Sequence, residues 1–88
     1  MNLVFAKSFA KDLRQIQDTS ILKRVQEIIH TLETAASLQD LKKLKRLSLE
    51  PRHYRLRLGD YRLGLTLRGE TVTLVRILHR KDIYRYFP

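Results

Sequence analysis

Hydrophobic residues in the first third of the chain recur with the period of a helix. A short apolar run at residues 3–5 suits a first strand. Three apolar residues then fall at i, i+4 and i+7, which predicts a helix from an N-cap at Ser8 to about Gln17; these are Phe9, Leu13 and Ile16. The strongest helical pattern follows the capping oxygens of residues 18–20 and continues to Leu32. We therefore expect two antiparallel helices joined by a short loop.

The period changes to two after Pro51. Basic residues dominate the stretch from Ala35 to Pro51, which we interpret as an irregular connector. Beyond it, apolar residues alternate with polar ones, and Gly59-Asp60 and Gly69-Glu70 are two-residue loops of the kind that make tight hairpins. Residues 53–78 are therefore predicted to form a three-stranded antiparallel meander, followed by a short C-terminal tail. The predicted fold class is α+β, in a single domain over residues 1–88.

Strand alternation predicts which side chains share a face of this meander. Arg55 and Arg57 lie on one face of their strand, and Arg62 on the next strand has the same outward parity. On the third strand we expect Thr73, Val75 and Ile77 in the core, which turns Val72, Leu74, Arg76 and Leu78 outward. An outward apolar patch of this kind either marks a partner surface or is covered by the chain's own tail at residues 83–87.

The charge of the chain adds a candidate ligand to this picture. The formal net charge is +9, from 18 Lys and Arg against 9 Asp and Glu. Residues 45–88 hold eleven basic and four acidic residues, and nine of the eleven are Arg. Because the planar guanidinium binds phosphate through two parallel hydrogen bonds, this half of the chain suits a polyanion such as nucleic acid. The alternative is a basic surface that serves only solubility.

Several classes of protein are excluded by what the chain lacks. Without Cys it has no disulfide framework, thiolate metal site or Cys nucleophile. No apolar run approaches the roughly 18 residues of a membrane span, and the first residues lack the features of a signal peptide. We therefore expect a cytoplasmic protein that does not engage a membrane.

Three segments of the second half carry a family resemblance. These segments are Tyr54-Arg55-Leu56-Arg57, Gly59-Asp60-Tyr61-Arg62, and His79-Arg80 with Tyr84. They resemble the RelE/ParE toxin superfamily of bacterial toxin–antitoxin systems. The resemblance covers essentially the whole chain and implies a RelE-like fold. It also implies a cognate antitoxin that wraps the toxin and covers or disorders its active site, with operator DNA as a partner of that complex only. RelE-type members cleave mRNA on ribosomes, whereas ParE-type members share the fold but inhibit DNA gyrase.

The RelE resemblance implies a metal-independent endoribonuclease that needs no cofactor. Such an enzyme uses the 2′-hydroxyl of the substrate as nucleophile, so the protein supplies a base, an acid and positive charge for the transition state. Basic residues and a tyrosine match the RelE pattern at Arg55, Arg57, Arg62, Arg80 and Tyr84. Typical RelE proteins carry lysines at the positions of Arg55 and Arg57, and one of these is often assigned as the general base. Arginine is a poor replacement, because its reference pKa of about 12.5 to 13.8 leaves almost no neutral form.

Histidine is the residue type that we expect to replace the missing lysine. The candidates are His53 and His79, and we favour His79 because it adjoins Arg80 at the end of a strand on the basic side of the molecule. The predicted catalytic set is therefore His79 with the five positions of the RelE pattern. The predicted RNA-binding set comprises Lys42, Lys43, Lys45, Arg46, His53, Arg76 and Lys81.

Two other functions remain open at this stage. A ParE-like toxin would bind gyrase without cleaving RNA, and an inactive relative would act only by binding a partner. We favour the enzyme, a toxin of a type II toxin–antitoxin system that cleaves mRNA on the ribosome.

Overall fold

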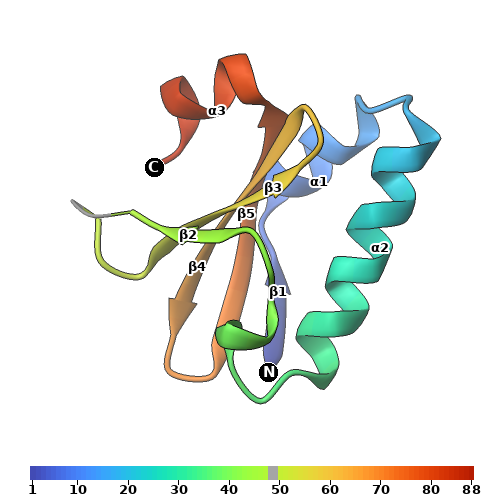
Figure 1. Cartoon of the computed structure of the whole chain (residues 1–88). Coiled ribbons are helices and arrows are strands. Elements are labelled where there is room, and N and C mark those ends of the chain that lie inside the picture. The colour runs from blue at the N-terminus through green and yellow to red at the C-terminus, as the bar shows by residue number, and fades with distance from the viewer. Residues whose placement is uncertain (48–49) are drawn as a thin grey trace.

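The computed structural model describes residues 1–47 and 50–88, and within them it has one five-stranded sheet with helices on both sides (Figure 1). The elements in chain order are β1 (Asn2–Phe5), α1 (Lys7–Arg14), α2 (Thr19–Thr34), a 3₁₀ turn (Leu38–Asp40), β2 (Leu44–Arg46), β3 (His53–Leu58), β4 (Tyr61–Arg68), β5 (Thr71–His79) and α3 (Arg80–Tyr86). The strand order is β1-β5-β4-β3-β2, with β1 parallel to β5 and the other neighbours antiparallel.

The two predicted helices cover one face of the sheet, where the main core lies. The apolar stripe of α2 is buried against leucines of β3 and β4. Asp18 caps this helix as its sequence indicated, since its carboxylate accepts from the backbone N–H groups of Ser20 and Ile21. The Ser20 hydroxyl, 2.7 Å from that carboxylate, and the Ile21 N–H hold the pKa of Asp18 below its ordinary value.

The prediction for the start and end of α1 was wrong. The helix begins at Lys7 with Ala6 at the N-cap, and it ends at Arg14 rather than near Gln17. The Ser8 hydroxyl donates to the backbone oxygen of Val75 at 2.6 Å instead of capping the helix. This hydrogen bond ties α1 to β5, which a local capping rule cannot anticipate.

The prediction of an irregular connector between Ala35 and Pro51 was also wrong. The stretch contains the 3₁₀ turn and β2, which pairs antiparallel with β3 and places Lys45 opposite Arg55. Residues 48–49 of the connector lie outside the described residues. The predicted meander is confirmed as β3, β4 and β5, and it gains β2 at one edge and β1 at the other.

The parity predicted for the third strand holds from Arg76 to Leu78 and fails before Arg76. The register pairs Gly64 with Arg76 and Leu65 with Leu74, so a β-bulge inserts Val75 as an extra residue. Val72 and Leu74 therefore turn toward the helices, and both are 0% exposed. The sequence predicted an outward apolar patch of these two residues with Leu78. That patch does not form, and Leu78 is half-buried.

The C-terminal helix α3 covers part of the opposite, open face of the sheet, as Figure 1 shows. Its Ile83 and the following Phe87 are buried. A Cβ on Gly64 would lie 2.6 Å from the Phe87 ring, so only glycine leaves room for this ring on β4. The tail therefore folds back over the sheet, but it covers Gly64 of β4 rather than the apolar patch predicted for Val72 and Leu74.

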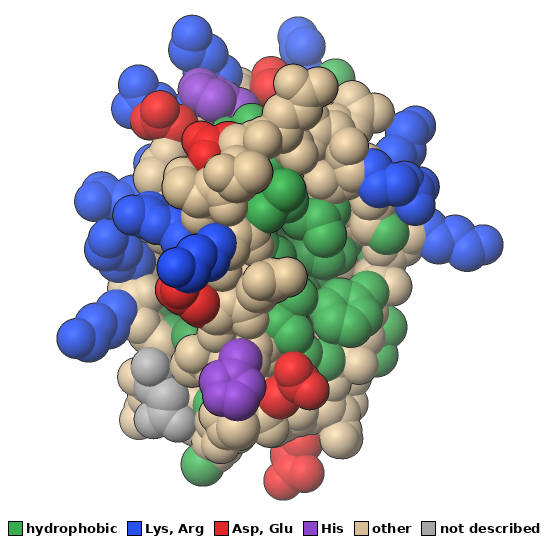
Figure 2. Space-filling view, turned by 90° about the vertical axis from the view of Figure 1, so that its right-hand side faces the viewer, with side chains coloured by type: hydrophobic (Ala, Val, Ile, Leu, Met, Phe, Trp, Pro, Cys, Tyr) green, Lys and Arg blue, Asp and Glu red, His purple; other side chains and the backbone are tan. Residues whose placement is uncertain are grey.

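Some apolar side chains reach the surface on the side of the molecule that carries α2. Figure 2 shows hydrophobic side chains in the middle of this side and Lys and Arg side chains standing out around its margins. Among the described residues, no helix is long and apolar enough to cross a membrane.

Candidate nucleic-acid interface

A cleft lined by cations lies on the open face of the sheet, beside α3. Strands β2, β3 and β4 and the turn before β2 supply its basic residues, and α3 supplies an aromatic one. The residues of this cationic cleft are Lys43, Lys45, Arg55, Arg57, Arg62 and Tyr84. No carboxylate is among the described residues that line it. The field in the cleft is therefore positive and suits an anionic group.

Like charges face each other across the strands of this cleft. Lys45 lies opposite Arg55 in the register of β2 and β3, and Arg57 lies opposite Arg62 in that of β3 and β4. Like charges directly opposite in a sheet destabilise it. Two such pairs side by side do not stabilise the sheet, and they concentrate positive charge on this face.

Among residues 1–47 and 50–88, no carboxylate pairs with the two half-buried arginines of the cleft, Arg55 and Arg62. One guanidinium nitrogen of Arg62, Nη1, donates to the backbone oxygens of Gly59 at 2.8 Å and Tyr61 at 2.9 Å. The guanidinium carbon of Arg55 stands 4.4 Å from the centre of the Tyr84 ring, a cation–π contact. Tyr84 is 67% exposed, so its ring stays open to a ligand. These contacts orient both arginines and leave their charge available.

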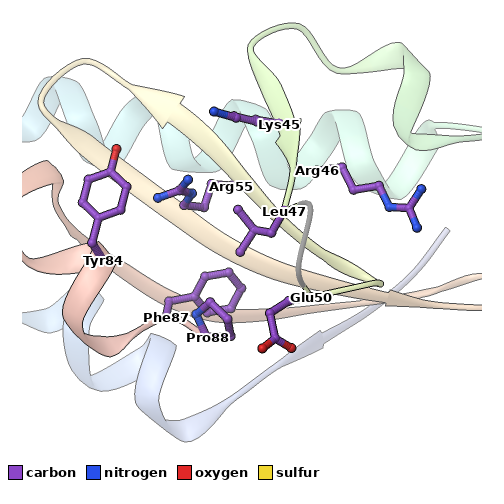
Figure 3. A pocket seen from close by; sticks show the side chains of 8 residues that line it. All are labelled: Lys45, Arg46, Leu47, Glu50, Arg55, Tyr84, Phe87 and Pro88. Atoms are coloured by element: carbon purple, nitrogen blue, oxygen red, sulfur yellow. The ribbon is translucent and has the colours of Figure 1, made fainter.

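A second hollow of about 310 Å³ adjoins the cationic cleft and is shown in Figure 3. This adjoining pocket shares Lys45, Arg55 and Tyr84 with the cleft. It adds Arg46, Leu47, Glu50, Phe87 and Pro88. Glu50 is the one acidic side chain among the described residues that line either hollow. Sequence reasoning did not select Glu50, since nothing in the local pattern marks it.

The structure brings four of the six predicted catalytic residues together and separates one. Arg55, Arg57, Arg62 and Tyr84 line the cationic cleft. His79 instead contacts the ring of Tyr61, accepts from the Lys81 N–H through Nδ1, and lines hollows that open toward α1 and α2. It shares no described hollow with the cleft arginines.

Arg80, the sixth predicted catalytic residue, is exposed at the start of α3. Its backbone N–H donates to the Asp60 oxygen at 2.7 Å. Asp60 belongs to the same β3–β4 turn whose Gly59 oxygen holds Arg62. Arg80 and Arg62 are thus anchored to one turn.

The predicted RNA-binding residues fall in several places. Lys43 and Lys45 line the cationic cleft and Arg46 lines the adjoining pocket. Lys42 lies in a further hollow against α2, and Lys81 is exposed in the first turn of α3. His53 packs its ring 5.6 Å from that of Phe87 and contacts the Pro51 oxygen through Nδ1 at 3.1 Å. Lys45 and Arg46 lie on β2, a strand of three residues that the sequence pattern did not reveal.

Arg76 lies opposite Gly64 on the outward side of the sheet but does not line the cationic cleft, and its guanidinium is paired with a carboxylate. Its Nε and Nη2 donate to the two carboxylate oxygens of the buried Asp12, at 2.7 and 2.9 Å. The Ile77 N–H also donates to Asp12, at 3.1 Å. The hydrogen bonds to Asp12 raise the pKa of Arg76 above its ordinary value. The pair joins α1 to β5, and the Tyr86 ring of α3 lies 5.4 Å from the guanidinium carbon.

Removing the carboxylate of Asp12 is expected to destabilise the fold. Asp12→Ala leaves the Arg76 guanidinium and the Ile77 N–H without their partner, and breaking a buried pair costs about 3–5 kcal/mol. The Arg76 side chain is 25% exposed, so the low end of that range applies. Urea unfolding measures the loss, with Glu33→Ala on the exposed face of α2 as control. A loss no larger than that of the control would show that the pair does not stabilise the fold.

Comparisons with known proteins bear directly on this arrangement. The family model described as "ParE toxin of type II toxin-antitoxin system, parDE" matches residues 3–84. Toxin RelE3 of Methanocaldococcus jannaschii is 43% identical over 89 residues, with both chains covered in full. The chain belongs to the RelE/ParE toxin superfamily. The resemblance inferred from the sequence is therefore confirmed.

Solved structures agree with this membership of the RelE/ParE superfamily. The chain is similar to one in the RelB-RelE antitoxin-toxin complex from Methanococcus jannaschii, with a TM-score of 0.83, 41% identity, and coverage of 97% of this chain and 99% of that one. A chain in the RelE-RelB complex from Pyrococcus horikoshii OT3 matches with a TM-score of 0.72 and 21% identity, over 90% and 93% of the two chains. The second likeness bears on the fold alone. The predicted RelE-like α+β fold is confirmed.

Proposed function

We propose that this RelE/ParE-type toxin is a cytoplasmic endoribonuclease that cleaves mRNA on the ribosome and is neutralised by a cognate antitoxin. The observation that carries the proposal is the cationic cleft, in which two cross-strand pairs of like charge lie beside an exposed tyrosine. The antitoxin partner is supported by the similar RelE chain, which was solved as a RelB-RelE complex.

The positive charge of the cleft suits metal-independent cleavage of RNA. The 2′-hydroxyl gives its proton to a base and attacks the adjacent phosphorus, and the bond to the 5′-oxygen breaks. The 5′-oxygen takes up a proton from solvent, so a 2′,3′-cyclic phosphate and a 5′-hydroxyl result. Negative charge grows on the phosphoryl oxygens in the transition state, and Arg55, Arg57 and Arg62 stabilise it. Arg80, anchored to the same turn as Arg62, adds a further phosphate contact. Tyr84 stacks on a base of the single-stranded substrate.

Lys45 is the residue that we assign to proton transfer in place of His79. It lies opposite Arg55 and lines the cleft, whereas His79 shares no described hollow with the cleft arginines. An amine gives up its proton more readily than a guanidinium, so lysine suits proton transfer better than arginine does. Lysine from β2 thus supplies the residue type that is missing at positions 55 and 57.

Mapping of mRNA 5′ ends tests the proposed function. The chain is expressed from a tight promoter in a bacterial host, with and without a block of translation, beside the variant Arg80→Ala. We expect new cuts within reading frames that vanish with the block and with the variant. Growth arrest with intact mRNA and broken chromosomal DNA would assign the toxin to gyrase instead. Absence of arrest would favour a partner-binding protein without activity.

A further inference from the structure

Tyr84 is held at the cationic cleft by the helix that carries it. Its ring is 67% exposed, and the contact that the structure describes for it is the Arg55 guanidinium, 4.4 Å from the ring centre. A cation–π contact at an exposed site is weak, so it does not fix the ring by itself. The position of Tyr84 therefore depends on how α3 is attached to the sheet.

Helix α3 is too short to be stable without the sheet. It has seven residues, whereas an isolated helix in water needs roughly 12–15 even with favourable residues. Two buried side chains attach it, Ile83 within the helix and Phe87 directly after it, at 0% and 3% exposure. The Phe87 N–H donates to the Ile83 oxygen at 2.9 Å, which joins Phe87 to the last turn of the helix. Packing of these two side chains therefore decides where α3 lies.

The Phe87 ring lies on the bare backbone of Gly64. A Cβ at this position would stand 2.6–2.7 Å from three atoms of the ring. Strand β4 is paired on both sides, with Gly64 opposite Arg55 of β3 and Arg76 of β5, so its backbone is held in place. The ring, and not the strand, would have to move to make room for a methyl group.

The contacts of Tyr84 and Phe87 with the sheet are in register with each other. The two residues are three apart in the chain, about one helical turn. The residues that they contact, Arg55 and Gly64, are direct partners in the pairing of β3 and β4. Figure 3 shows Tyr84 beside Arg55 and Phe87 over the sheet. A shift of Phe87 away from Gly64 therefore moves Tyr84 away from Arg55.

We infer that Phe87 is a positioning residue, whose ring, packed on Gly64, holds Tyr84 against Arg55 at the cationic cleft. The ring is too deeply buried to meet a ligand itself. The charge of the cleft does not depend on it, since the β3–β4 turn holds Arg62. The inference rests on the proposed function only in taking single-stranded RNA as the ligand whose base stacks on Tyr84.

An NMR measurement without RNA tests the position of Tyr84. In the full chain, prepared free of antitoxin, we expect a nuclear Overhauser cross-peak between the Tyr84 ring and the Arg55 side chain. Gly64→Ala should remove the cross-peak, because the methyl group displaces Phe87. Adding Phe87→Leu to that variant should restore it, since the smaller side chain leaves room for the methyl group. Gly69→Ala is the control and should keep the cross-peak, because a Cβ there meets nothing within 4 Å.

Binding of RNA tests the consequence for the cleft. The ligand is a short single-stranded RNA with methylated 2′-hydroxyls, which cannot be cleaved. Tyr84→Ala is expected to weaken binding about 5- to 150-fold, the contribution of one stacked base. Gly64→Ala should cause a similar loss, and combining the two should cause no further loss, because the first acts through Tyr84. A substitution that only destabilised the fold would leave the affinity of the folded chain unchanged.

Two results would overturn the inference. One is a cross-peak that survives Gly64→Ala, and the other is a loss of RNA affinity in Gly64→Ala that adds in full to that of Tyr84→Ala. Where Gly64→Ala does not fold, Phe87→Ala removes the ring without crowding the sheet and has the same expected results.

The two measurements separate this inference from the proposed function. A cross-peak that is lost and restored as expected, in a chain that binds no RNA, retains the role of Phe87 and contradicts the nuclease. Cleavage of mRNA by a chain whose cross-peak survives Gly64→Ala retains the nuclease and contradicts the role of Phe87.

Discussion

Lys45→Arg is expected to lower the rate of RNA cleavage by about 10²- to 10⁴-fold, the contribution of a general base or acid. The substitution keeps the positive charge opposite Arg55, so binding of RNA should change little. What it removes is the amine that we assign to proton transfer with the 2′-hydroxyl, a role for which a guanidinium is a poor replacement. Single-turnover cleavage of a labelled mRNA on purified ribosomes measures the rate, and a binding titration measures the affinity.

The control for this prediction is Lys42→Arg. Lys42 is an exposed residue of the same segment, and it lines a hollow against α2 instead of the cleft. It should cleave at the rate of the unmodified chain. The pH–rate profile adds a second measurement, since loss of the base should remove the rise of the rate with pH. If Lys45→Arg cleaves normally, Lys45 is a phosphate contact and the base lies elsewhere.

Arg62→Ala is expected to reduce cleavage by about 10²- to 10³-fold, as the loss of one preorganised donor to a developing oxyanion does in other enzymes. The Arg62 guanidinium is held by the backbone oxygens of Gly59 and Tyr61 and has no described carboxylate partner. Its charge is therefore already oriented before substrate binds, which alanine cannot replace. The slope of log affinity for single-stranded RNA against log salt should also fall by about 0.7.

Arg68→Ala provides the matched control, because Arg68 is exposed at the far end of the same strand. This variant changes the net charge equally and should leave the rate of cleavage unchanged. Equal losses in the two variants would show that overall charge, and not the geometry of the cleft, governs activity.

The shared face of the arginines was readable from the sequence because a tight turn fixes the register of β3 and β4. Gly59 has a φ of 58°, in the left-handed region that a two-residue hairpin turn requires. Once the turn is set, alternation places Arg55, Arg57 and Arg62 on one side. The same argument failed for β5, where one bulged residue, Val75, reverses the parity of every residue before it.

Pairing between distant segments was not readable in this way. Strand β2 has three residues, too few for a period to stand out among the basic residues around it. The position of α3 depends on the Phe87 ring meeting the bare backbone of Gly64, a contact between residues far apart in the chain. The Asp12–Arg76 pair likewise joins α1 to β5 and pairs one outward arginine with a carboxylate.

By itself, therefore, the sequence determined the family, the succession of helices and meander, and the arginine face, since periodicity and turn chemistry are local properties of the chain. Only the tertiary structure decided which groups join that face. It brings Lys43, Lys45 and Tyr84 to the cleft and Glu50 to the pocket beside it, and it leaves His79 on the side of α1 and α2. These neighbours are set by strand pairing and by packing of side chains across the sheet, which no local pattern encodes.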